Sequence, residues 1–286
     1  MSAQHTQPVT PALQQWIVEQ VRAGHSHEAV LKSMLDSGWA EDVAIVALEE
    51  TLEAFVASHA RDNGLPEPVL VPQPLGDDGA ASVWAGDREV QLLVNLRAPR
   101  LIVFGGLLSH DECDALVEMA QVRLARSETV QLATGASEVN EARTSEGMFF
   151  EREENALCAR IEARIAALLD WPLENGEGLQ VLRYQPGAEY KPHYDYFDPA
   201  QPGTPAILQR GGQRVATLVT YLNTPRRGGA TIFPDVKLDV APIKGNAVYF
   251  SYDRPHPMTQ SLHGGAPVLE GEKWVATKWL REGRFS

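Results

Sequence analysis

A histidine and an aspartate stand two residues apart near the middle of the chain. His193 and Asp195 end a segment whose composition predicts an extended strand. Side chains at positions i and i+2 of a strand leave the same face, so an imidazole nitrogen and a carboxylate oxygen would lie side by side. Two such ligands do not fix a metal ion, and the chain offers a third in His256 or His263. Two histidines and one carboxylate are the facial ligand set of non-haem Fe(II).

The segment that follows His263 combines a strand pattern with one lysine. Lys273 lies ten residues beyond His263 and begins a stretch that contains Trp274, Trp279 and Leu280. The spacing of these apolar residues is typical of a buried strand. A single ammonium group beside a metal site would pair with the distal carboxylate of a bound dicarboxylate.

Further motifs follow one another between about Pro99 and Arg281. They are, in order, Arg143-Thr-Ser-Glu-Gly-Met148, Tyr184, Tyr190, His193-Tyr-Asp195, Gly212-Gln-Arg-Val-Ala-Thr217, Gly228-Gly-Ala-Thr231, Phe233-Pro234, Lys244-Gly-Asn-Ala247, Phe250, Ser261-Leu-His263, Pro267-Val268, Lys273-Trp274 and Lys278-Trp279. In identity and order this set resembles the prolyl 4-hydroxylases, a family of Fe(II)- and 2-oxoglutarate-dependent dioxygenases.

The resemblance implies a set of cofactors and metal ligands. The cofactors would be Fe(II), 2-oxoglutarate and dioxygen, with ascorbate bound as reductant. The ligands of Fe(II) would be His193, Asp195 and His263. His256 is flanked by two prolines and has no lysine at the family's spacing, so we expect a loop residue there.

The resemblance also assigns roles around the metal. Lys273 would pair with the distal carboxylate of 2-oxoglutarate, and Tyr184 and Thr217 would place hydroxyl groups near the same molecule. We interpret Lys278 as a solvated lysine. The residues that resemble the family's substrate-binding positions are Tyr190, Arg214, Trp279 and Arg143.

Two of these substrate assignments have alternatives in the sequence. Tyr190 lies three residues before His193, so strand alternation turns it away from the metal unless the chain bends near Pro192. For Trp279 the alternative is a core residue. We also interpret the segments 134–150 and 198–212, rich in glycine, proline and polar residues, as candidate lids over the site.

The activity implied by the resemblance is the hydroxylation of a prolyl residue in a protein or peptide. It would be coupled to oxidative decarboxylation of 2-oxoglutarate to succinate and CO2. One alternative is the same machinery acting on a free amino acid or small metabolite. Another is a partner-binding protein that acts through its helical N-terminus.

Composition narrows the class of protein. The 286 residues are 44% hydrophobic and 22% charged, as in an ordinary globular protein. The net charge of −13 argues against nucleic acid as a partner. The chain shows neither a signal-peptide pattern nor an apolar run long enough to span a membrane. Cys113 and Cys158 are its only cysteines, and we expect buried thiols in a reducing, cytoplasmic compartment.

Periodicity predicts an α+β protein with a small helical domain followed by a catalytic domain. In residues 1–60 we expect three short helices, which form a domain similar to ubiquitin-associated folds. In residues 61–96 we expect a proline-rich linker with edge strands. Within residues 97–286 we expect helices over 109–121 and 153–169, the first opened by a capping box. The strands predicted in the chain are 89–95, 100–104, 181–184, 190–194, 216–222, 230–233, 236–240, 247–252 and 274–280. Such a run of strands indicates a jelly roll, the double-stranded β-helix of the family.

Overall fold

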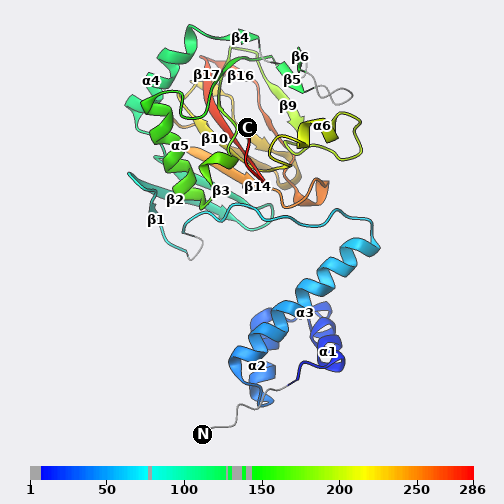
Figure 1. Ribbon diagram of the computed structural model, residues 1–286. Coiled ribbons are helices and arrows are strands. Elements are labelled where there is room, and N and C mark those ends of the chain that lie inside the picture. The colour runs from blue at the N-terminus through cyan, green and yellow to red at the C-terminus, as the bar shows by residue number, and fades with distance from the viewer. Residues whose placement is uncertain (1–7, 77–78, 127, 131–136, 140–143) are drawn as a thin grey trace. The chain divides into compact units, whose positions relative to one another are not determined.

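The chain divides into two compact units, Met1–Glu67 and Pro68–Ser286. The computed structural model in Figure 1 describes residues 8–76, 79–126, 128–130, 137–139 and 144–286. Arg143, a predicted substrate residue, therefore lies outside the described residues. Within the described part, no helix is both long and apolar enough to cross a membrane.

The N-terminal unit is a bundle of three helices, α1 (Pro11–Arg22), α2 (His27–Asp36) and α3 (Glu41–Asp62). The hydroxyl groups of Thr10 and Ser26 accept hydrogen bonds from backbone N–H groups in the first turns of α1 and α2, which fixes where these helices begin. The three helices share one apolar core, made of Ile17, Val30, Met34, Ala44, Ala47 and Leu48. The alanines on α3 let the other two helices approach closely.

The larger unit is built on two antiparallel sheets (Figure 1). The major sheet runs in the order β1 (Ser82–Trp84), β2 (Glu89–Leu96), β3 (Leu101–Gly105), β14 (Ala247–Ser251), β10 (Arg214–Tyr221), β17 (Lys273–Arg281), β8 (Leu179–Tyr184), β7 (Glu146–Phe150), β4 (Ala125–Arg126). The minor sheet runs β13 (Leu238–Val240), β12 (Thr231–Phe233), β15 (His263–Gly265), β9 (Tyr190–His193). This is the double-stranded β-helix expected from the sequence.

Short pairs complete the larger unit. Strands β11 (Arg227–Gly228) and β16 (Val268–Glu270) pair with each other, as do β5 (Glu128–Val130) and β6 (Ser137–Val139). The short helix α6 (Thr204–Leu208) follows the proposed metal motif in sequence. In the segment 61–96, predicted as a linker with edge strands, β1 and β2 form the edge of the major sheet.

Alternation along the major sheet separates two cores. On β17, Trp274 and Ala276 face the outer core, where helices α4 (His110–Gln121) and α5 (Ala156–Leu169) cover the sheet. Val275 faces the inner core between the two sheets. Because both faces of this central strand are covered, all nine of its residues are buried.

Three sequence predictions differ from the structure in this unit. The end of the predicted lid 134–150 is strand β7, whose Phe150 is buried in the outer core. Helix α5 begins at Ala156 because the Asn155 side chain caps it. Lys278, interpreted as solvated, is buried beneath α5 and bonds to the Glu162 carboxylate and the Glu177 carbonyl.

Candidate active site

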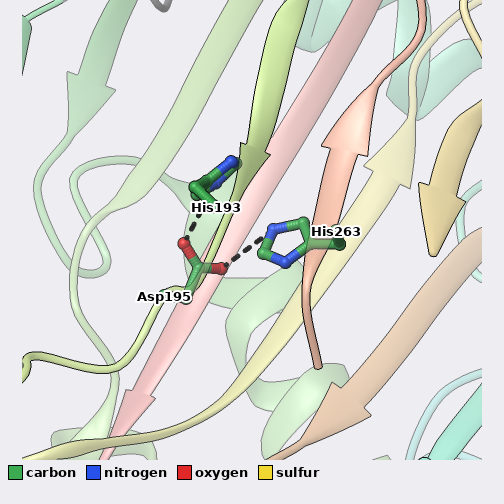
Figure 2. A group of neighbouring side chains, drawn as sticks. All are labelled: His193, Asp195 and His263. Atoms are coloured by element: carbon green, nitrogen blue, oxygen red, sulfur yellow. Dashed lines mark ion pairs between the residues drawn. The ribbon is translucent and has the colours of Figure 1, made fainter. Parts of the chain in front are cut away.

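The predicted ligands His193, Asp195 and His263 lie together between the two sheets. His193 ends β9 and His263 begins β15, and the register of these neighbouring strands sets the two residues directly opposite each other. Asp195 follows β9 by two residues. One ligand atom from each side chain lies within 4.8 Å of the other two, and Figure 2 shows the three groups turned toward one another.

Backbone carbonyls fix how both imidazoles present their nitrogens. His193 Nδ1 lies 2.9 Å from the Lys191 carbonyl, and His263 Nδ1 lies 3.0 Å from the Ser261 carbonyl. A carbonyl only accepts, so each Nδ1 carries a hydrogen, and in the neutral ring the lone pair is on Nε2. These lone pairs face Asp195, at 3.6 Å from Oδ1 and 3.4 Å from Oδ2. Three acceptors thus converge with no hydrogen between them, an arrangement that a cation stabilises.

The charge states of the buried ligands suit a metal ion. Burial lowers the pKa of His263 to about 4, so this imidazole is neutral at neutral pH. Burial alone would raise the pKa of Asp195, but the Arg214 guanidinium lowers it, which favours the ionised carboxylate. A neutral imidazole and an ionised carboxylate are the forms that bind Fe(II), so the residues fit that ion.

A hydroxyl group on the neighbouring sheet holds the carboxylate. Thr217 on β10 donates a hydrogen bond of 2.7 Å from Oγ1 to Asp195 Oδ2. The sequence predicted Thr217 near 2-oxoglutarate, and the residue does line the same cavity as the three ligands. Its single hydrogen is given to Asp195, however, so it has none left to donate to a co-substrate.

Lys273 lines the same cavity. It is 4% exposed, and its Nζ lies 5.6 Å from the ring centre of Tyr184 and 5.7 Å from that of Tyr221. Strand register places Lys273 directly opposite Tyr184. Burial lowers the pKa of Lys273 to about 8. A buried ammonium flanked by aromatic rings is a strong site for an anionic carboxylate.

Tyr190 lies beside the ligands, on the side that simple alternation did not predict. Its ring stacks on the His193 imidazole with a centroid distance of 3.7 Å. The reason is an irregularity in the pairing of β9 with β15, where His193 pairs with His263 but Tyr190 pairs with Gly265. The four residues Tyr190–His193 therefore oppose the three residues His263–Gly265, and the side chains of Tyr190 and His193 both reach the cavity.

Trp279 is at once buried and part of the cavity wall. Its side chain lines the cavity, and the residue is 7% exposed. Among the residues that the structure describes, its Nε1–H is one of two buried side-chain polar atoms without a hydrogen-bond partner. A buried donor without a partner is costly, which favours a ligand that accepts this hydrogen.

Arg214 has a different environment from the one expected of a substrate-binding residue. Its guanidinium makes two hydrogen bonds to the Glu177 carboxylate, of 2.7 and 3.0 Å, and stacks 3.9 Å from the centre of the Trp279 ring. Arg281 bonds to the same carboxylate at 2.6 Å. The guanidinium thus packs against the indole, and Arg214 is absent from the cavity lining.

We expect Arg214→Ala to lower the free energy of unfolding by about 3 kcal/mol, because it removes one partner of a buried ion pair. Thermal or urea unfolding measures this effect. The matched control is Arg183→Ala, which removes a more exposed pair with Glu146 and should cost about 1 kcal/mol or less. Equal, small losses in both variants would contradict a structural role for Arg214.

His256, the alternative third ligand, lies apart from the other three. It precedes the short 3-10 helix Pro257–Thr259, and its Nδ1 accepts a hydrogen bond from the backbone N–H of Met258. It is not part of the cluster of possible metal ligands found among the described residues.

Several residues around the site were not predicted from the sequence. They are Glu177, Tyr221, Thr231 and Tyr252. Tyr221 donates to Thr231 beside Lys273, and Tyr252 contacts Thr217. Strand alternation could have predicted that Tyr221 and Thr231 face inward. Which hydroxyl groups meet, however, depends on how strands far apart in sequence pair.

Comparisons with known proteins agree with this geometry. The sequence profile of the 2OG-Fe(II) oxygenase superfamily matches residues 179–281, the stretch from β8 to β17. Prolyl 4-hydroxylase 1 of Arabidopsis thaliana is 40% identical over 227 residues, which cover 70% of this chain and 78% of that protein. The chain belongs to the prolyl 4-hydroxylase family. It is a 2-oxoglutarate-dependent dioxygenase, with Fe(II) and 2-oxoglutarate as cofactors.

Other relatives of this prolyl 4-hydroxylase family member match over similar lengths. "Probable prolyl 4-hydroxylase 7" of Arabidopsis thaliana is 38% identical over 207 residues, or 65% of this chain and 64% of that protein. Among solved structures, the viral collagen prolyl hydroxylase of Paramecium Bursaria Chlorella virus-1, in complex with 2OG, is 31% identical. The match covers 63% of this chain and 95% of the viral protein's chain, with a TM-score of 0.49.

Proposed function

We propose that the chain hydroxylates a prolyl residue in a protein or peptide. The observation that carries this proposal is the convergence of three acceptors, from His193, Asp195 and His263, in a cavity that Lys273 also lines. The names of the family's relatives support proline as the target.

The metal would be held by His193 Nε2, His263 Nε2 and an oxygen of Asp195. Fe(II), when bound with 2-oxoglutarate and dioxygen, supplies oxidative decarboxylation to succinate and CO2 and transfer of one oxygen atom to a C–H bond. The protein's own part is to hold the two histidines in the Nδ1–H tautomer and to keep the carboxylate ionised.

Lys273 would bind the distal carboxylate of 2-oxoglutarate. Its Nζ is buried between Tyr184 and Tyr221, so the ion pair would form away from water. Tyr184 also lines the cavity and could present its hydroxyl to the same molecule, as the family resemblance implies. The other end of the co-substrate would then reach the three metal ligands.

The target proline would lie against Tyr190 and Trp279. Both rings line the cavity next to His193 and Asp195, and flat aromatic walls suit a pyrrolidine ring. The Trp279 Nε1–H would donate to a carbonyl of the peptide, which would satisfy its missing hydrogen bond. Arg214 would then hold the indole rather than the substrate.

The cytoplasm is the compartment that we propose for the enzyme. Cys113 and Cys158 are both buried as free thiols, and burial raises the pKa of each to about 11. Two unpaired, buried thiols suit a reducing compartment.

The test of substrate class compares peptide with free proline. Succinate release should rise when a proline-containing peptide is added, and should not rise with free proline at the same concentration. A matched peptide with alanine in place of proline is the control. Stimulation by free proline alone would favour the alternative, hydroxylation of a free amino acid.

The affinity for 2-oxoglutarate should depend on pH through Lys273. Burial lowers the pKa of this lysine to about 8, and only its protonated form pairs with a carboxylate. The KM for 2-oxoglutarate should therefore be constant below about pH 8 and rise above it. In Lys273→Arg the charge persists to higher pH, so this rise should vanish even if the KM is higher throughout. The same rise in both enzymes would exclude Lys273 as its origin.

A further inference from the structure

Two hydroxyl groups link the core of the larger unit to the carboxylate of the metal site. Thr217 Oγ1 lies 2.7 Å from Asp195 Oδ2, and Tyr252 Oη lies 2.9 Å from Thr217 Oγ1. The exposed fractions of Asp195, Thr217 and Tyr252 are 6%, 0% and 1%, so water does not compete for these bonds. The three side chains form a continuous, buried chain of two hydrogen bonds.

The direction of both bonds follows from counting hydrogens. The Asp195 carboxylate has none, so Thr217 must donate its only hydrogen to it. The contact between Thr217 and Tyr252 then has one possible donor, the phenol of Tyr252. Burial raises the pKa of Tyr252 well above its usual value, so the phenol keeps its hydrogen. The order is Tyr252 to Thr217 to Asp195.

Strand pairing places Tyr252 next to Thr217. Tyr252 directly follows β14, and its backbone N–H bonds to the Val215 carbonyl on β10 at 2.9 Å. Thr217 lies two residues further along β10, on the same face as Val219 and the inner core. This backbone bond sets the phenol against Thr217.

We propose that Tyr252 is a positioning residue for the metal, which acts through Thr217 on the orientation of Asp195. The inference rests on the metal site of the proposed function. Without the phenol, the buried Thr217 oxygen loses its donor, and the threonine hydroxyl is free to turn away from the carboxylate. A carboxylate that is held in place before the metal arrives costs less entropy to order when the metal binds.

The test is the affinity of the full-length, metal-free protein for Co(II) alone, followed by its visible absorption. Tyr252→Phe should weaken Co(II) binding by about 3- to 10-fold, the scale of one net hydrogen bond. Thr217→Val should weaken it by about 10- to 100-fold, the usual loss for a partner of a metal ligand. The absorption bands of bound Co(II) should also change in both variants.

Tyr249→Phe is the matched control. Tyr249 lies on β14, three residues before Tyr252, and is equally buried, but its hydroxyl donates to the Pro72 carbonyl. Each tyrosine variant loses one buried hydrogen bond, so their unfolding temperatures should fall by similar amounts. Only Tyr252→Phe should lose affinity for Co(II).

A double substitution decides whether Tyr252 acts through Thr217. In the Thr217→Val background, Tyr252→Phe should cause no further loss of Co(II) affinity. An equal loss in both backgrounds, or a loss no larger than that of Tyr249→Phe, would overturn the proposal. A wild-type protein that bound no Co(II) would overturn the metal site itself. Binding of Co(II) without hydroxylation of any prolyl peptide would count against the substrate alone.

Discussion

His263→Ala is expected to abolish turnover and to weaken Fe(II) binding by more than about 100-fold, since losing even an outer partner of a ligand costs about 10- to 100-fold. His263 supplies one of three converging acceptors, and no other histidine or carboxylate joins that cluster in the part of the chain that the structure describes. The metal-free fold should survive, because removing one of three facing lone pairs relieves electrostatic repulsion. Iron content after dialysis and succinate release measure the two effects.

His256→Ala is the control for this substitution. His256 is bound to its own loop through the Met258 N–H and lies outside the ligand cluster. Iron content and succinate release should stay near the wild-type values. The reverse pattern, with iron lost from His256→Ala and kept in His263→Ala, would mean that the third ligand has been misassigned.

Lys273→Met should raise the KM for 2-oxoglutarate by about 30-fold or more. The substitution keeps most of the side-chain volume and removes the charge, which leaves a buried carboxylate without its partner at a cost of about 2–5 kcal/mol. The maximal rate at saturating 2-oxoglutarate should fall much less, because Lys273 is not one of the metal ligands. Succinate release at a series of 2-oxoglutarate concentrations measures both quantities.

Lys278→Met is the control. It tests whether the rise in KM is specific to Lys273 or follows the loss of any buried lysine on β17. Lys278 bonds to Glu162 on the outer face of the same strand. Its loss should lower stability while the KM for 2-oxoglutarate stays unchanged. If the KM for 2-oxoglutarate were unchanged in Lys273→Met, the assignment of Lys273 to the co-substrate site would be wrong.

Local periodicity predicted much of this protein. His193 and Asp195 could be paired from their spacing, and the capping box at Ser109 and Glu112 marked the start of α4 correctly. Lys273 and its tryptophans were placed on one strand, and that strand is β17. Each of these inferences depends on residues that are close in sequence.

Inferences that depend on distant contacts were less accurate. Alternation misplaced Tyr190 because the irregular pairing with β15 is a property of two strands. The environment of Arg214 depends on Glu177, 37 residues earlier in the chain. Tyr252 reaches Asp195 only through the pairing of β14 with β10. No pattern of neighbouring residues in the sequence predicts these contacts between distant residues.

The most direct test of the proposed activity follows a proline-containing peptide and 2-oxoglutarate in one reaction with Fe(II). We expect the peptide to gain the mass of one oxygen atom on its proline, with one succinate formed for each hydroxylated peptide. Both products should be absent when His263→Ala replaces the wild-type enzyme. Succinate release that persists in His263→Ala, or a wild-type enzyme that leaves every prolyl peptide unmodified, would contradict the account.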